Sequence, residues 1–209
     1  MGAHVQRLVR NRWLSWLIPR VIGIDLGSSH LKVLLAEQAF GRLRILEHRL
    51  VDLQEESLLS QEEINAHLRK IVQEMGHYPV ALTVPQHLCL SHLVDLPPAR
   101  DGEIQRLMEQ ETKNLSGLSD SSMVYHYHPL RPFGRMANPF WLTISREPEI
   151  QAQINRLATE DNGLSVAAVS SIADSLITTY LACRPATKRV VLIDLGATST
   201  VVALSLIHI

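Results

Sequence analysis

Apolar and polar positions alternate in blocks along the chain, and these blocks predict a mixture of strands and helices. Apolar stretches separated by short turns, at 21–26, 31–37 and 42–53, predict three consecutive strands. A helix is expected next, because Ser60 and Glu63 form a capping-box pattern and apolar residues then recur at helical spacing until a glycine. The apolar side of this helix consists of Ile64, Leu68, Ile71, Val72 and Met75.

The rest of the chain continues the same mixture. Further strands are predicted for the apolar stretches 79–85, 88–97, 123–130, 139–146 and 164–170. Further helices are predicted for the stretches 101–115, 147–163 and 171–183. Three strands in a row do not fit a purely parallel α/β alternation, so we expect an α/β fold with an antiparallel flap.

Composition and charge exclude some classes of protein. The 209 residues carry a formal net charge of −1, which gives no electrostatic case for nucleic-acid binding. Two distant cysteines, Cys89 and Cys183, favour a reducing compartment. His126 and His128 share a strand face but lack further metal ligands, and no apolar run approaches the roughly 18–20 residues of a membrane-spanning helix.

The strongest signal is a repeat. The stretch VIGIDLGSSHLKVLL at 21–35 is nearly repeated as VVLIDLGATSTVVAL at 190–204. Each copy has an apolar run that ends in Asp-Leu-Gly, then a turn of small residues and a returning apolar run. One copy alone is typical of an ordinary β-hairpin with a glycine turn. Two matching copies favour duplicated halves that face each other across one ligand.

Such a hairpin can bind phosphate. Glycine lets the backbone come close to a ligand, and the N–H groups and hydroxyls of the turn can then point at phosphate oxygens. An aspartate at the strand end can hold Mg²⁺ through water. The chain has neither the GxxxxGK[ST] nor the GxGxxG pattern. Two hairpins of this kind would clamp the phosphates of one nucleotide from both sides of a cleft.

The two hairpins resemble the phosphate-1 and phosphate-2 loops of the actin/Hsp70-like ATPase superfamily. Within it, the order of segments over roughly 21–204 is similar to the PilM family of type IV pilus assembly proteins. The segments in question are ALTVPQHLCLSHLVDLP, EIQRLMEQETKNLSGLSDSSMVYHYHPL, FWLTIS and NGLSVAAVSSIADSLITTYL. The resemblance implies an actin-like (ribonuclease H-like) ATPase first domain with an inserted α+β subdomain, arranged as in the cell-division protein FtsA.

The resemblance also implies an organisation in four parts. A basic amphipathic leader (1–20) precedes the first domain (21–96 and 166–189), which is interrupted by the inserted subdomain (97–165). We expect the leader to be a mobile segment packed on the domain rather than a helix on anionic lipid. The family continues through a second domain with a Gly-rich adenosine loop, so 190–209 would be the start of a largely missing second domain and the chain would be C-terminally truncated.

The ligand implied by the resemblance is ATP with Mg²⁺. The first loop carries over to Asp25, Gly27, Ser28, Ser29 and Lys32. The second loop carries over to Asp194, Gly196, Ala197 and Thr198. The two aspartates would hold Mg²⁺ through water. No residue is a clear candidate for positioning an attacking water, because Gln86 and Glu37 fit structural roles better, so we expect slow ATP hydrolysis or none.

The family's partner is the short cytoplasmic tail of PilN, a single-pass inner-membrane protein. The resemblance therefore implies a cytoplasmic scaffold at the inner-membrane face of a bacterium, in which nucleotide biases docking of that tail and other pilus proteins are near. Twitching motility would follow from such a role. Two alternatives stay open: a small-molecule kinase of the same superfamily, and an interaction module that binds no nucleotide.

Overall fold

The computed structural model describes residues 20–39, 42–55, 60–116, 122–158, 164–182 and 190–205. The expected leader lies outside the described residues, apart from Arg20, and stays a prediction. Among the helices in the described ranges, none combines the length and the apolar character needed to cross a bilayer.

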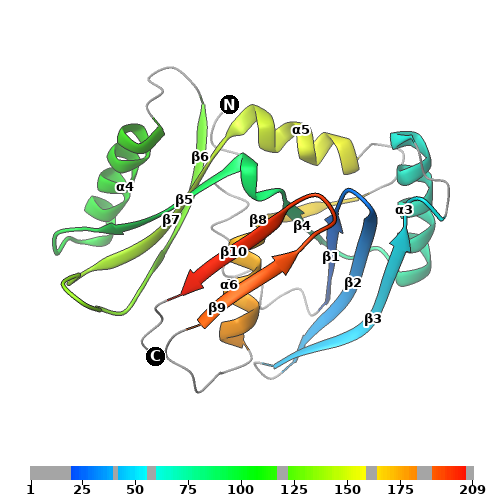
Figure 1. Cartoon of the computed structure of the whole chain (residues 1–209), viewed down its shortest axis with the longest axis horizontal. Coiled ribbons are helices and arrows are strands. Elements are labelled where there is room, and N and C mark those ends of the chain that lie inside the picture. The colour runs from blue at the N-terminus through cyan, green and yellow to red at the C-terminus, as the bar shows by residue number, and fades with distance from the viewer. Residues whose placement is uncertain are drawn as a thin grey trace.

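The largest sheet has five strands in the order β3-β2-β1-β4-β8 (Figure 1). Its antiparallel half is formed by β1 (Arg20–Leu26), β2 (His30–Ala39) and β3 (Arg42–Asp52). Its parallel half is formed by β4 (Val80–Val84), which pairs with β1, and β8 (Val166–Ser171), which pairs with β4. The mixed sheet with an antiparallel flap, expected from three consecutive strands, is confirmed.

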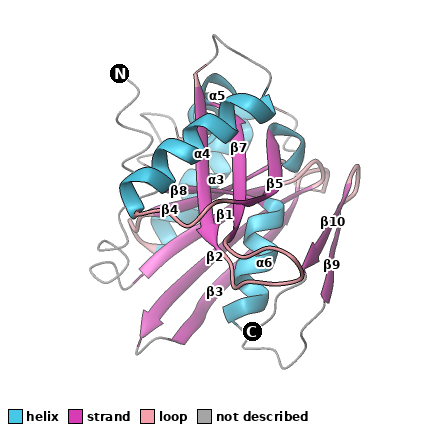
Figure 2. Cartoon of the chain, turned by 90° about the vertical axis from the view of Figure 1, so that its left-hand side faces the viewer, coloured by secondary structure: helices cyan, strands magenta, loops and turns pink. Residues whose placement is uncertain are grey.

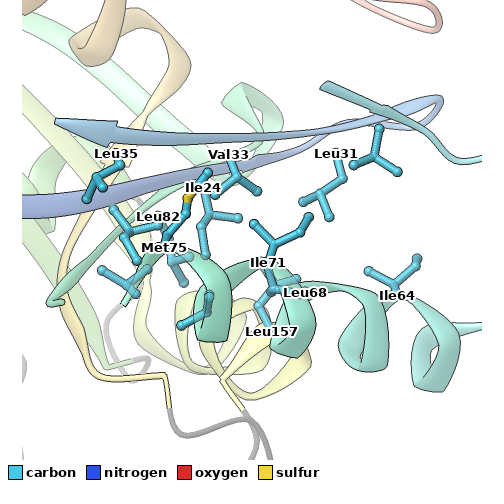
Figure 3. Packing of buried hydrophobic residues seen from close by; sticks show 14 of the residues in the cluster. Ile24, Leu31, Val33, Leu35, Ile64, Leu68, Ile71, Met75, Leu82 and Leu157 are labelled. Atoms are coloured by element: carbon cyan, nitrogen blue, oxygen red, sulfur yellow. The ribbon is translucent and has the colours of Figure 1, made fainter. Parts of the chain in front are cut away.

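Helix α3 (Gln61–Met75) covers one face of this sheet. Its capping box is confirmed: the Glu63 N–H donates to the Ser60 hydroxyl, and the Ser60 N–H donates to the Glu63 carboxylate. The helix ends at Gly76, whose φ of 102° favours glycine. Figure 3 shows its apolar side packed on buried sheet residues, among them Ile24, Leu31, Val33, Leu35 and Leu82.

A second sheet has three antiparallel strands in the order β5-β7-β6. They are β5 (Cys89–Asp95), β7 (Pro139–Arg146) and β6 (Met123–Pro129), and the short 3-10 helix η1 (Gln86–Leu88) leads into β5. Helix α4 (Asp101–Ser116) packs on one face of this sheet (Figure 2). The buried cluster between them consists of Leu96, Met108, Phe140, Leu142 and Ile144. Strand β5 precedes residue 97, where the inserted subdomain was expected to begin.

Helices α5 (Glu147–Leu157) and α6 (Ile172–Ala182) complete the described helices. Helix α5 ends before the predicted limit of 163, and its Leu157 is buried in the core of the five-stranded sheet. Residues 159–163 lie outside the described residues.

The second copy of the repeat forms a hairpin of β9 (Val190–Leu195) and β10 (Thr200–Ser205). In the described part of the chain these two strands pair with each other and join neither larger sheet. They lie beside α6 and in front of the five-stranded sheet in Figure 1. One face of the hairpin exposes Val191, Ile193, Leu195 and Val202, whereas Ala203 on the other face is buried.

Candidate functional site

The turns of the two repeated hairpins lie in contact. Thr198, in the turn between β9 and β10, donates a hydrogen bond from Oγ1 to the Ser28 Oγ in the turn between β1 and β2, over 3.1 Å. The two residues are 170 positions apart in the sequence. The fold therefore brings the two copies of the motif to one place, as the repeat predicted.

The same backbone hydrogen bond closes both turns. The Gly27 N–H donates to the His30 carbonyl oxygen and the Gly196 N–H to the Ser199 carbonyl oxygen, each over 2.9 Å. A Cβ placed on Gly27 would lie 3.2 Å from the His30 oxygen, and one placed on Gly196 would lie 2.8 Å from the Ser199 oxygen. Close backbone approach therefore explains why glycine stands at both positions.

Charged side chains from both hairpins gather beside the turns. The Lys32 Nζ donates to the Asp25 Oδ2 over 3.0 Å, because the two residues are opposite each other in the β1–β2 ladder. This hydrogen bond raises the pKa of the Lys32 ammonium; the charges of Asp25 and Asp194 act in the same direction, and partial burial opposes them. The charged form of Lys32 is thus stabilised by one carboxylate from each hairpin.

The nine residues expected at the site do not all have the same environment. Ser28, Thr198, Asp25, Lys32 and Asp194 gather as described above. Ala197 is exposed in the second turn. The Ser29 Oγ lies 2.7 Å from the His30 Nδ1, so this hydroxyl contacts an imidazole that the sequence analysis did not single out.

Two more polar residues at the site were missed. Asp52 at the end of β3 has its Oδ2 3.6 Å from the His30 Nε2, and Thr83 on β4 is opposite Asp25 in the parallel ladder. The sequence does contain a weak signal, since a threonine interrupts the apolar run of residues 80–84. The proximity of Asp52 depends on strand pairing, which no local pattern reveals.

Two hollows lie at or near the first hairpin. One of about 370 Å³ has Asp25 and Lys32 in its polar lining and Leu34 and Leu50 in its apolar lining. Another of about 310 Å³ is lined by Gly27 and Ser28 together with side chains from three other segments, namely Leu53, Gln54, Ile64 and Arg156. The second hollow reaches the turn itself, whereas the first lies beside it, on the strand residues that carry Asp25 and Lys32.

Gln86 and Glu37, the two residues considered for positioning water, have other contacts. The Gln86 Oε1 accepts the Ala173 N–H at the start of α6 over 3.0 Å, and its Nε2 donates to the Cys89 carbonyl oxygen over 3.4 Å. Glu37 forms an ion pair with Arg20 over 3.1 Å. These contacts fit the structural roles that the sequence favoured for both side chains.

The residues present fit a phosphate chain with Mg²⁺. The two turns bring together hydroxyls, one ammonium and two carboxylates, which are the groups that bind phosphate oxygens and hydrated Mg²⁺. No group of three or more His, Cys, Asp or Glu side chains in the described ranges is arranged to hold a metal ion. Mg²⁺ does not require one, because it keeps several waters and uses one or two carboxylates plus phosphate oxygens.

Two solved structures share this fold. A chain of the PilM-PilN type IV pilus biogenesis complex aligns with a TM-score of 0.67 at 15% identity, covering 88% of this chain and 57% of that one. The cytoplasmic domain of EpsL, an inner membrane component of the type II secretion system of Vibrio cholerae, aligns with a TM-score of 0.55 at 13% identity, covering 90% of this chain and 69% of that one. No protein-family model matches the sequence. No curated protein matches it significantly.

These likenesses establish the fold and not the activity. The chain has the fold of a partial actin-like domain, in agreement with the fold class expected from the sequence. It spans 57% of the length of the chain from the PilM-PilN complex. Any activity or partner of the longer proteins is therefore a matter of proposal for this chain.

Proposed function

We propose that this chain binds ATP with Mg²⁺ between its two hairpin turns and acts as a cytoplasmic scaffold of a PilM-like pilus assembly machine. Its partner would be the cytoplasmic tail of a PilN-like inner-membrane protein, and nucleotide would bias that interaction. The observation that carries the proposal is the direct contact between the turns, Thr198 to Ser28. The contact supports a single binding site built from both copies of the motif.

Five side chains of the site would bind the phosphates or the metal in this proposal. Lys32 would bind phosphate oxygens as a point charge, and its partner Asp25 would turn from the ammonium towards the hydrated Mg²⁺. Asp194 would approach the metal from the second hairpin. The hydroxyls of Ser28 and Thr198, which now bond to each other, would donate to phosphate instead. Mg²⁺, when bound, would neutralise phosphate charge.

The docking half of the proposal is supported by the fold similarity. The similar structure is described as a PilM-PilN complex, and the similar EpsL domain belongs to an inner-membrane component. A scaffold that responds to nucleotide needs two states with different affinity for the partner. The bond between Ser28 and Thr198 would break when phosphate enters, which changes how the second hairpin sits on the first.

Nucleotide binding is tested by titrating the chain with a fluorescent ATP analogue, with Mg²⁺ and with EDTA. Lys32→Gln should weaken binding about tenfold or more in both conditions, because a charge-assisted phosphate contact is lost. Asp25→Ala should weaken binding to a similar extent with Mg²⁺ and much less with EDTA, because its carboxylate serves the metal. Lys70→Gln, at an exposed position on α3, is the matched control. Unchanged affinity in Lys32→Gln would contradict the site assignment.

Docking is tested with a fluorescent peptide of a PilN-like cytoplasmic tail, titrated with and without MgATP. A difference in Kd between the two conditions supports a nucleotide-biased scaffold. Tail binding by a chain that binds no nucleotide would instead favour the interaction module. A screen of small phosphoryl acceptors tests the kinase alternative, and acceptor turnover would overturn the scaffold.

A further inference from the structure

Three side chains at the edge of the site form a hydroxyl–imidazole–carboxylate series. The Ser29 Oγ lies 2.7 Å from the His30 Nδ1, and the His30 Nε2 lies 3.6 Å from the Asp52 Oδ2. Side-chain exposures of 39% for His30 and 33% for Asp52 leave the series open to a ligand. Nothing in the proposed nucleotide clamp requires His30 or Asp52.

The backbone holds the three residues in place. The Leu53 N–H donates to the Ser29 carbonyl oxygen over 2.8 Å, and the Gly27 N–H donates to that of His30. His30 and Asp52 are direct partners in the antiparallel ladder of β2 and β3. Their side chains are therefore on the same face of the sheet, at neighbouring positions.

That face is the one that carries the proposed nucleotide site. Side chains alternate along a strand, so His30 shares a face with Lys32, whereas Leu31 points into the core. Asp25, opposite Lys32, is on the same face. The series therefore lies beside the charged residues of the site, and Ser28, next to Ser29, contacts the second turn.

The carboxylate is oriented towards the imidazole. The Asp52 Oδ1 accepts the N–H groups of Gln54 and Glu55 over 2.8 and 3.2 Å, which leaves Oδ2 for His30. These backbone hydrogen bonds, and to a lesser extent the charge of His30, lower the pKa of Asp52, so that its carboxylate is ionised at neutral pH. An ionised carboxylate favours the tautomer with the proton on Nε2 and stabilises the imidazolium that forms when Nδ1 gains a proton.

We propose that Ser29 is a phosphoryl acceptor, activated by His30 as general base and by Asp52 as the residue that positions His30. The donor is the nucleoside triphosphate of the proposed function, on which this inference rests. A bond forms between the Ser29 Oγ and the terminal phosphorus, and the bond from that phosphorus to the bridging oxygen breaks. The hydroxyl proton moves to the His30 Nδ1, and nucleoside diphosphate leaves.

The phosphorylated Ser29 would in turn inhibit nucleotide binding at the site. A phosphoserine carries a charge of about −1.5 to −2 and would stand beside Asp25 and Lys32. It would compete with the phosphates of a new nucleotide for the ammonium. Self-phosphorylation would therefore close the site to ATP and fix the scaffold in one state.

The first readout needs no nucleotide. A fluorophosphonate probe reacts with serine hydroxyls that have a general base, and peptide mass spectrometry locates the label. We expect a label on Ser29 of the wild-type chain, none on that position in Ser29→Ala, and labelling slower by about a hundredfold in His30→Gln. Asp52→Asn should slow labelling less. Ser165→Ala and His87→Gln, both at exposed positions, are matched controls and should label like the wild type.

The second readout uses the nucleotide. The chain is incubated with MgATP, and phosphoserine is located by mass, while nucleotide affinity is measured on the same samples. Phosphate on Ser29 that depends on His30, with nucleotide affinity retained in His30→Gln, supports the inference. Nucleotide binding with neither phosphate nor probe on Ser29 overturns the inference and leaves the proposed function standing. Absence of nucleotide binding, even with His30-dependent probe labelling, overturns the proposed function and, with its donor, this inference.

Discussion

At the scale of single residues, the glycines of the two turns decide whether the site can form. Gly196 lies close to backbone: a Cβ there would come within 2.8 Å of the Ser199 oxygen, which real Cβ atoms do not do. The turn would have to open and lose its Gly196 to Ser199 hydrogen bond. Gly102 in α4, by contrast, has no atom within 4 Å of the added Cβ position.

Gly196→Ala should therefore lower both the stability and the nucleotide affinity. We expect a loss of about 1–2 kcal/mol in the free energy of unfolding, measured by urea titration, because a hydrogen bond is lost and the turn is displaced. Gly102→Ala is the control and should be neutral or stabilising by up to about 1 kcal/mol, because alanine is the better helix former. Equal stability of the two variants would contradict the close approach seen in the second turn.

The site also shows what a sequence can reveal at this scale. The Asp-Leu-Gly repeat predicted duplicated halves that face each other, and the contact between the turns through Thr198 and Ser28 agrees with that placement. Ser29 and His30 are consecutive residues, so their proximity follows directly from the sequence. Asp52, however, is 22 positions beyond His30 and reaches it through the ladder of β2 and β3. Its contribution could not be predicted without knowing the register of that ladder.

At the scale of elements, the sequence predicted well those helices and strands whose formation depends on residues close together in the chain. The capping box at Ser60 and the apolar spacing after it predicted α3 closely, because a helix and its cap depend on residues a few positions apart. Strand β5 was also predicted as a strand, yet its place in the second sheet was not. The sheet to which β5 belongs is set by its pairing with β7, about 50 positions away in the sequence. The sequence of β5 alone does not indicate which strand it pairs with.

Strand β6 has one face that responds to pH. The Nε2 atoms of His126 and His128 lie 2.9 Å apart, which confirms the shared face expected from their spacing. Burial, and next the neighbouring His128, lower the pKa of His126 to about 4, while Asp174 acts in the opposite direction. In an unfolded chain the imidazole has its ordinary pKa of about 6.5 and binds more protons over this range.

Stability should therefore fall as the pH falls from about 6.5 towards 4. We expect a loss of about 1–2 kcal/mol in unfolding free energy between about pH 7 and pH 5, after allowing for partial exposure of the ring. His126→Gln should reduce this loss, whereas His77→Gln, at an exposed position, should leave it unchanged. Urea titrations at the two pH values measure this loss. A loss in His126→Gln as large as that of the wild type would exclude His126 as its cause.

At the scale of the whole molecule, one carboxylate joins the second sheet to the helix behind the hairpin. Asp174 at the start of α6 accepts hydrogen bonds from the Trp141 Nε1 over 2.6 Å and from the Thr143 Oγ1 over 3.1 Å, both on β7. Helix α6 also contacts both strands of the β9–β10 hairpin. The second sheet and the β9–β10 hairpin are thus linked through one helix.

Asp174→Ala should weaken the connection between strand β7 and helix α6. The buried Thr143 hydroxyl and the half-buried Trp141 N–H would lose their acceptor, so we expect a loss of about 2–3 kcal/mol in unfolding free energy and faster amide hydrogen exchange in β7 and α6. Asp174→Asn keeps a side-chain oxygen that can accept, and should cost less. Equal exchange rates in the alanine variant and the wild type would show that the sheet is held by other contacts.

The hydrogen bond between Thr198 and Ser28 also has a consequence for the order in which the parts of the chain fold. It closes a loop of 170 positions, and closing a long loop is entropically costly until the chain between its ends has folded. The site should therefore complete itself late in folding, after the sheets and α6 are in place. Contacts that are absent from the folding transition state slow unfolding when they are strengthened, with little effect on the folding rate. A ligand held between the turns would thus lengthen the lifetime of the native state rather than speed its formation.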